Sequence, residues 1–281
     1  MRVFRPCISL LSLVALCASF MPVAHAELPT DKWGLQEFEL FTSDNLEDAK
    51  EETLPRLKRK LAAKNMVYGK PVFIRIFKES RELEMWIQKN EEFELFRTYP
   101  ICEMSGRIGP KLEQGDDQAP EGFYWVNEGW MHPKSSFHLA MNVGYPNAYD
   151  KEHNRTGSAI MIHGECSSSG CFAMTDDYIE EIYLLSEAAL IAGQPFFRVQ
   201  IFPFRMTDAN MKRHKGYRWY SFWENLKEGY DFFEAHKRPA NAEVLDGRYV
   251  FNDSNEPPPL FAIASAAEEE EAKEAKKIGI D

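Results

Sequence analysis

The chain has 281 residues, of which 44% are hydrophobic, and carries a formal net charge of −11 at pH 7. Its length accommodates one large domain or one domain with extensions. The acidic balance argues against a nucleic-acid-binding protein, because affinity for phosphates requires clustered positive charge and the basic run at residues 58–60 stands alone.

The first 26 residues have the layout of a secretory signal peptide. Two arginines lie near the start, and an apolar run covers roughly residues 8–20. Residues 24–26 read Ala-His-Ala, which places small residues at the two positions that a signal peptidase reads. The apolar run is short for a membrane span. We therefore expect export with cleavage after Ala26, and an uncleaved N-terminal anchor is the alternative.

Hydrophobic spacing and turn residues predict the elements that follow. Helices are predicted over residues 45–64, over residues 81–89 with Ser80 as the cap, from Thr175 or Asp176 to about Ala192, and within residues 217–236. Strands are predicted over residues 72–77, 93–101, 123–126, 137–143, 159–163 and 196–202. Glycines and prolines at residues 106–122 predict loops and tight turns. The strand at 159–163 ends directly before a turn that contains two cysteines.

This turn, GECSSSGC, carries the residue types of a cysteine nucleophile. Such a nucleophile needs a base, backbone N–H groups for a developing oxyanion, and room for a substrate. His163 ends the strand, and Cys171 ends the turn shortly before the next predicted helix. Ser169 and Gly170 are small enough to expose the thiol and to aim backbone amides at a substrate.

Two other interpretations fit the same cysteines. Removal of the signal peptide leaves Cys102, Cys166 and Cys171, and this odd number leaves at least one thiol unpaired within an exported chain. Cys166 and Cys171 form a structural disulfide in one alternative and belong to a zinc site in the other. The remaining histidines show no spacing typical of zinc ligands. From spacing alone, catalysis, disulfide and zinc all stay open.

The segment IHGECSSSGCFAMTD resembles the active-site segment of the YkuD-type L,D-transpeptidase superfamily, in its YafK-like branch. Three more segments resemble the same branch in the same order: YPICEMSGRIGPKLEQGDDQAPEGFYWV, FHLAMNVGYPNAYD and VQIFPFRMTD. The resemblance covers roughly residues 66–208. Several motifs in order are far more specific than one Cys/His pair.

The resemblance implies roles for individual residues. Cys171 matches the nucleophile and His163 matches the base, so Cys166 becomes a bystander, which we expect to pair with Cys102. Gly164, Ser169 and Gly170 are expected to form the active-site loop with its oxyanion amides. His138 and Tyr145 lie in segments that resemble the family and are expected to line the cleft. Arg107 and Lys111 are candidates to meet stem-peptide carboxylates through their charge, with a solvated loop charge as the alternative.

Two positions depart from the family pattern. Ser169 stands where most members have a histidine, and Ala173 stands where many members have an arginine. That arginine is a natural partner for a substrate carboxylate. Its replacement puts the usual recognition of a donor stem peptide in doubt.

The resemblance also implies a fold that is mostly β with flanking helices (α+β). A catalytic domain of the L,D-transpeptidase type, with a β-sandwich or curved sheet, would occupy residues 66–208 and need neither metal nor cofactor. Around it we expect a signal peptide (1–26), an N-terminal helical segment (27–65), a C-terminal helical extension (209–240), and a proline-containing linker with an acidic low-complexity tail (241–281).

The implied substrate is the stem peptide of peptidoglycan, which would place the protein in the periplasm. Cys171 would attack an amide next to diaminopimelate and form a thioester. An amine acceptor would make the protein an L,D-transpeptidase, a transferase of cell wall organization and cell shape. Water would make it a hydrolase, and the YafK-like branch is associated with cutting the bond between peptidoglycan and an outer-membrane lipoprotein.

Two further classes of function remain as alternatives. The protein would be a non-catalytic peptidoglycan-binding envelope protein if the enzyme fold had lost its activity. It would be an exported domain unrelated to the cell wall if Cys166 and Cys171 were bridged.

Overall fold

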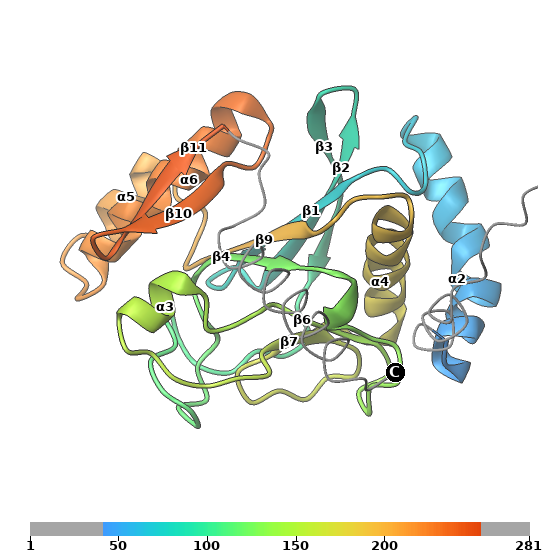
Figure 1. Cartoon of the computed structure of the whole chain (residues 1–281), viewed down its shortest axis with the longest axis horizontal. Helices are drawn as coiled ribbons and strands as arrows, with labels where there is room; N and C mark the ends of the chain where they lie inside the picture. Colours follow the sequence, from blue (N-terminus) through green and yellow to red (C-terminus); the bar gives the residue numbers. More distant parts are fainter. Residues whose placement is uncertain (1–41, 254–281) are drawn as a thin grey trace, which may run out of the picture.

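The computed structural model describes residues 42–253, so the predicted signal peptide and acidic tail lie outside the described residues. A five-stranded mixed sheet runs through their centre in the order β3-β2-β1-β9-β4 (Figure 1). Its strands are β1 (Val72–Phe77), β2 (Glu82–Lys89), β3 (Glu92–Pro100), β4 (Gly122–Val126) and β9 (Phe197–Phe202). β1 and β9 pair in parallel, and the other pairs are antiparallel.

A second, four-stranded sheet carries the segment between His163 and Cys171. Its strands are β5 (Met131–His132), which follows the 3₁₀ turn η1 (Glu128–Trp130), β6 (Ala140–Asn142), β7 (Met161–His163) and β8 (Phe172–Ala173). The helix α4 (Asp176–Ile191) contacts β1 of the first sheet and β6 and β7 of the second. Two sheets with helices around them make the fold α+β, which confirms the predicted class.

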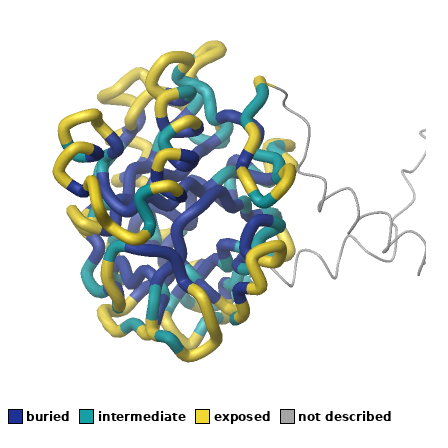
Figure 2. The backbone as a smooth tube through the Cα atoms, turned by 90° about the vertical axis from the view of Figure 1, so that its left-hand side faces the viewer, coloured by how far each residue is buried: buried dark blue, intermediate teal, exposed yellow. Residues whose placement is uncertain are grey.

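The main core lies on one face of the five-stranded sheet. Because side chains alternate along a strand, every second residue of β1 and β9 points toward α4, and these residues are fully buried: Ile74, Ile76, Val199 and Ile201. The helix α2 (Asp44–Ala63) packs on α4 with leucines at helical spacing and runs through Pro55 without ending. Figure 2 shows the buried interior as a continuous dark-blue set of segments.

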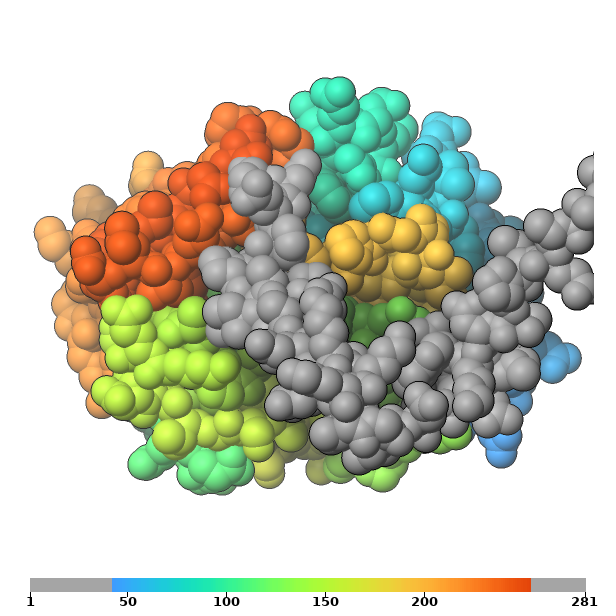
Figure 3. All heavy atoms as spheres, in the orientation of Figure 1, coloured from blue at the N-terminus to red at the C-terminus, as the bar shows by residue number. Residues whose placement is uncertain are grey.

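An aromatic layer covers the opposite face of this sheet. It consists of α5 (Asp208–Arg213), α6 (Tyr220–His236) and a hairpin of β10 (Asn241–Leu245) and β11 (Arg248–Asn252). Phe77 and Phe202 stack with ring centroids 5.9 Å apart, and Tyr230 of α6 packs edge-on against Phe202 at 5.4 Å. The hairpin adjoins the short helix α3 (Ala148–Glu152), as the red-orange and yellow-green surfaces of Figure 3 show.

The prediction of a helix at residues 81–89 is wrong. These residues form β2, in which Leu83, Met85 and Ile87 are buried on one face. Their period of two is a strand pattern, and pairing with β1 and β3 satisfies the backbone. Ser80 caps no helix, since its hydroxyl donates to the Glu82 carboxylate in the turn before β2.

The prediction of a linker from residue 241 onward is wrong for residues 241–252. Asp246 and Gly247 both have positive φ angles, as a two-residue hairpin turn requires. Tyr249 anchors the hairpin, because its ring is 2% exposed and stacks on Tyr149 at 4.4 Å. Within residues 42–253, no helix is long and apolar enough to cross a membrane.

Two smaller differences concern the ends of elements near the candidate site. Thr175 is the residue before α4, as predicted, but its side chain makes no capping hydrogen bond and its φ is 71°. The strand predicted at 137–143 is reduced to β6, and the one at 159–163 to β7. Residues 137–139, 143 and 159–160 were predicted as strand but lie in loops near His163 and Cys171.

Candidate active site

Pairing of β7 with β8 places the histidine and the cysteine on one face of the second sheet. The two strands run parallel, with Ile162 opposite Phe172 and His163 opposite Ala173. Ile162 and Phe172 are fully buried in the main core, so their neighbours along each strand point to the other face. His163 and Cys171 therefore share that face, two residue positions apart along the strands, with Cys171 beside Met161.

His163 is held as a neutral base. Its Nδ1 lies 2.7 Å from the Gly164 carbonyl oxygen, and because a carbonyl only accepts, Nδ1 carries the proton and Nε2 has the free lone pair. The ring is 3% exposed and packs against Phe137 at 4.8 Å. Burial lowers the pKa of His163 below its usual 6.5, although the Gly164 carbonyl acts in the opposite direction. The imidazole is therefore uncharged and able to accept a proton at neutral pH.

Cys171 is a free, half-buried thiol, and it is the one cysteine outside a disulfide within residues 42–253. Its Sγ accepts from the Met161 N–H at 3.4 Å and lies 3.6 Å from the Ala159 carbonyl oxygen. Burial raises the pKa of the thiol above its usual 9.0, while the Met161 N–H and the charge of Lys111 favour the thiolate. The thiol is therefore protonated at neutral pH and needs a base before it can attack.

A disulfide joins Cys102 to Cys166, with Cα atoms 5.5 Å apart. It confirms the pairing that we expected, and it excludes a bridge between Cys166 and Cys171. Residues 102 and 103 also pair with β8, since the Cys102 N–H donates to the Ala173 carbonyl at 2.8 Å. The turn that carries the free thiol is thus tied to the end of β3 through both backbone and sulfur. Among the described residues, no three His, Cys, Asp or Glu side chains form a metal site.

The two predicted oxyanion glycines donate their amides elsewhere. The Gly164 N–H donates to the carbonyls of Phe137 and Leu139, at 3.1 and 3.0 Å. A Cβ on Gly164 would lie 2.7 Å from an Asp176 oxygen, so this position requires glycine for packing. The Gly170 N–H donates to Ser105 Oγ at 2.5 Å, and its φ of 97° suits glycine. The exposed turn residue Ser169 completes the predicted loop.

Three of the residues predicted to bind substrate have different environments. His138 uses Nε2 to contact the Glu180 carboxylate of α4 at 2.9 Å. Tyr145 is buried, and its hydroxyl donates to backbone carbonyls of residues 111 and 156 at 3.3 Å each. Arg107 is exposed on a loop next to Ser105. The first two side chains are therefore engaged inside the protein, and only Arg107 projects into solvent.

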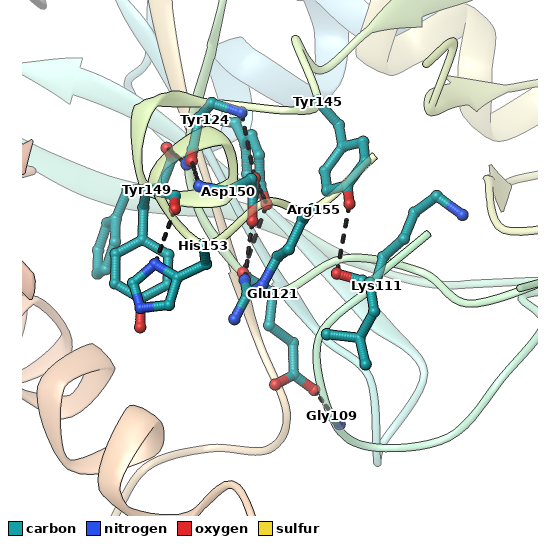
Figure 4. A network of polar contacts seen from close by, with 12 residues as sticks. Gly109, Lys111, Glu121, Tyr124, Tyr145, Tyr149, Asp150, His153 and Arg155 are labelled. Carbon is teal, nitrogen blue, oxygen red and sulfur yellow. Dashed lines mark hydrogen bonds and ion pairs between the residues drawn. The ribbon is translucent and has the colours of Figure 1, made fainter. Parts of the chain in front are cut away.

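The loop that carries Tyr145 is fixed by a buried polar cluster around Asp150 (Figure 4). Asp150 accepts from Arg155 at 2.8 Å, from the Tyr124 hydroxyl at 2.9 Å and from the Asn147 N–H at 3.1 Å. Figure 4 also shows Tyr145 reaching the backbone of residue 111, so the cluster and the neighbourhood of the thiol are linked through this loop.

A cleft near the site and the effect of Lys111 on the thiol were not predicted from the sequence. A cleft is lined by residues 128–129, residues 131–137 and Met161. Phe137 contacts the His163 ring, and the Met161 amide contacts the thiol. Lys111 is buried, pairs with Asp116 and donates to the Glu113 carbonyl at 2.9 Å. The sequence predicted Lys111 as a partner for a stem-peptide carboxylate and gave no indication that its charge acts on Cys171. The loop therefore supplies a positive charge that favours the thiolate.

Comparison with known proteins gives a consistent picture. Residues 71–189 match the model of the L,D-transpeptidase catalytic domain, YkuD. The chain is 49% identical over 187 residues to "Putative L,D-transpeptidase YafK" of Escherichia coli K12, covering 66% of this chain and 76% of that protein, and equally to the same protein of Escherichia coli O157:H7.

Solved structures are more distant. A variant of the helical cell shape determining protein Pgp2 from Campylobacter jejuni is 19% identical with a TM-score of 0.40, covering 60% of this chain and 57% of that one. Bd1075 of Bdellovibrio bacteriovorus is 22% identical with a TM-score of 0.36, covering 57% and 56%. The identity to YafK over most of its length shows that this chain belongs to the L,D-transpeptidase family with a YkuD catalytic domain.

Proposed function

We propose that the protein is an exported cysteine enzyme that acts on stem peptides of peptidoglycan through a thioester at Cys171. The observation that carries the proposal is the free, protonated thiol on the same sheet face as a neutral imidazole, beside a cleft. Membership of the L,D-transpeptidase family supports peptidoglycan as the substrate. The signal-like N-terminus supports export to the periplasm, where that substrate lies.

The proposed chemistry uses each group in the protonation state described above. His163 Nε2 takes the thiol proton as Sγ attacks the carbonyl carbon of an amide. We assign the developing oxyanion to the amides of Ser169 and Cys171, since those of Gly164 and Gly170 donate within the protein. Collapse breaks the C–N bond, and the leaving amine takes the proton from His163. A second nucleophile, an amine or water, then cleaves the thioester and restores the thiol.

A specific observation favours water over an amine, and with it an amidase that cuts the link between diaminopimelate and a lipoprotein. Ala173 stands where many members have an arginine, and it is fully buried in β8 with its backbone paired to residues 102 and 103. A long cation cannot occupy this position to hold a terminal carboxylate. A stem peptide joined to a protein has no such carboxylate, so it loses no ion pair when alanine stands in place of the arginine.

Product analysis by mass spectrometry tests the proposal. The purified protein and its Cys171→Ala variant are incubated with tetrapeptide muropeptides and with sacculi that carry covalent lipoprotein. Cross-linked or exchanged stems made only by the wild type would establish transpeptidation, and lipoprotein released with its terminal lysine intact would establish the amidase. Identical inactivity of both proteins on both substrates would favour a non-catalytic peptidoglycan-binding protein. N-terminal sequencing of the secreted protein checks cleavage after Ala26.

A further inference from the structure

A buried amide without a partner lies on the aromatic face of the five-stranded sheet. Phe197, Val199 and Ile201 of β9 point into the main core, so Gln200 points to the opposite face. Its side chain is 1% exposed, and within residues 42–253 neither its Nε2 nor its Oε1 has a hydrogen-bond partner. Buried amides almost always have partners, because leaving both groups unpaired costs free energy of folding. Gln200 therefore calls for a functional explanation.

Gln200 lines a cavity of about 250 Å³ between the five-stranded sheet and the C-terminal hairpin. The walls include the aromatic residues Phe123 and Trp125 from β4 and Tyr249 from β11. Asn147, another polar wall residue, already donates to the Phe123 carbonyl at 2.9 Å and to the Tyr249 hydroxyl at 2.8 Å. The wall thus combines flat apolar surfaces with an amide whose donor and acceptor are both unused inside the protein.

Charged side chains of both signs surround Gln200, and Glu243 also lines the cavity. Arg198 lines the same cavity and donates to Asn241 at 3.3 Å, and burial lowers its pKa to about 10. Arg75 lies directly opposite Gln200 on β1, is 1% exposed, and pairs with Glu234 at 2.7 Å. No hydrogen bond joins Arg75 to Gln200 in the described part of the chain, although the residues are neighbours. Because Glu234 pairs with Arg75 and Glu243 lies in the cavity wall, charges of both signs lie near the unpaired amide of Gln200.

We propose that this cavity binds a ligand through a neutral secondary amide. Gln200 Oε1 accepts from the N–H of the ligand, Gln200 Nε2 donates to its carbonyl oxygen, and its apolar carbons lie against Phe123, Trp125 and Tyr249. The volume is below the roughly 300–1,000 Å³ of pockets for drug-sized molecules, so it admits one such group and not a long chain. The acetamido group of an amino sugar and a peptide bond share this chemistry.

This site is separate from the thiol. No residue that lines the cavity contacts Cys171 or His163 through a described hydrogen bond or ring contact. The proposal therefore does not rest on the proposed function, and its failure would leave the chemistry at Cys171 untouched.

Calorimetric titration of the purified protein with two probes tests the site. Di-N-acetylchitobiose carries the amide on a sugar, and N-acetyl-L-alanine N-methylamide carries it on a peptide; saturable binding of either supports the site and identifies the source of the amide. The deacetylated disaccharide is the matched control, and we expect no binding because it lacks the amide. Absence of saturable binding by both acetylated probes overturns the proposal.

Two variants complete the test. Gln200→Met keeps the side-chain volume and removes the unpaired amide, so we expect at least about a tenfold loss of probe affinity together with a Tm raised by a few degrees. Unchanged affinity or a lowered Tm would contradict a ligand-binding role. Ala242→Leu fills the cavity from β10 and leaves Gln200 in place, so it should also abolish binding; wild-type affinity in this variant would place the ligand elsewhere.

Discussion

The cluster around Asp150 is a buried polar site, and the pair of His163 and Cys171 is a partly buried one. They differ in how many of their polar atoms make hydrogen bonds within the protein. Both oxygens of Asp150 accept hydrogen bonds, one from Arg155 and the other from Tyr124 and the Asn147 N–H. His163 uses only Nδ1, and the Cys171 thiol has two long contacts at 3.4 and 3.6 Å. Saturated groups hold a loop in place, whereas groups with unused capacity can act on a substrate.

Loss of the thiol should have the largest effect on function. We expect Cys171→Ala to lower turnover of the proposed substrate by at least about a thousandfold, because the covalent step disappears. The Tm should stay within about 2 °C of wild type, since the thiol makes only weak contacts. Kinetic assays on sacculi together with thermal unfolding check both parts. A variant that keeps a tenth of wild-type activity would show that Cys171 is not the nucleophile.

Loss of the Asp150 carboxylate should instead have its main effect on stability. Asp150→Ala leaves the buried Arg155 guanidinium without its partner, so we expect a loss of about 3–5 kcal/mol in the free energy of unfolding. Urea denaturation measures this change. Lys227→Ala is the control, because its partners Asp208 and Asp231 are exposed, and it should cost no more than about 1 kcal/mol. Equal effects of the two variants would contradict the structural role of the cluster.

The disulfide stabilises the turn that carries the thiol, so its removal should affect stability and activity together. We expect the double variant Cys102→Ser, Cys166→Ser to lose about 2–4 kcal/mol of stability. Turnover should also fall, because the sulfur bridge that ties the Cys171 turn to residue 102 is lost. Denaturation and kinetics under identical conditions measure both. A variant with full activity below its Tm would show that backbone pairing with β8 is sufficient to position the turn.

The smallest expected effect concerns the pH dependence of the thiol. The pKa of Cys171 is raised above 9.0, so its alkylation by iodoacetamide should still increase as the pH passes 9. The pKa of His163 lies below 6.5, so turnover should lose its base only when the pH falls through a value lower than 6.5. Alkylation that reaches a plateau near pH 7 would instead indicate a preformed thiolate–imidazolium pair.

Variants of Lys111 test the cause of the thiol pKa in the same alkylation assay. Its charge favours the thiolate, so Lys111→Met should raise the thiol pKa further and slow alkylation at pH 8 by a few fold. Lys111→Arg keeps the charge and is the matched control. If both variants react alike, the effect arises from the disturbed pairing with Asp116 and not from charge.

The sequence by itself determined most of the local elements and pointed to the candidate pair His163 and Cys171. Alternation and helical spacing predicted α2, β1, β3, β4, α4, β9 and α6 close to their observed bounds. Likewise, the motif that ends β7 and precedes β8 identified His163 and Cys171 as candidates. The two errors, at β2 and at the hairpin of β10 and β11, came from overlooking patterns that the sequence does contain: a period of two at 83–87 and an Asp-Gly turn at 246–247.

Tertiary structure alone decided which groups near the thiol remain available. Ser105 reaches the Gly170 amide from 65 residues away, and Glu180 reaches His138 from 42 residues away. Gly164, Gly170 and His138, which were predicted to face a substrate, have partners within the protein, because a polar atom looks available in a sequence until the fold supplies its partner. The same reason hides Gln200, since a glutamine in a strand is ordinary until packing buries it and leaves its amide unpaired.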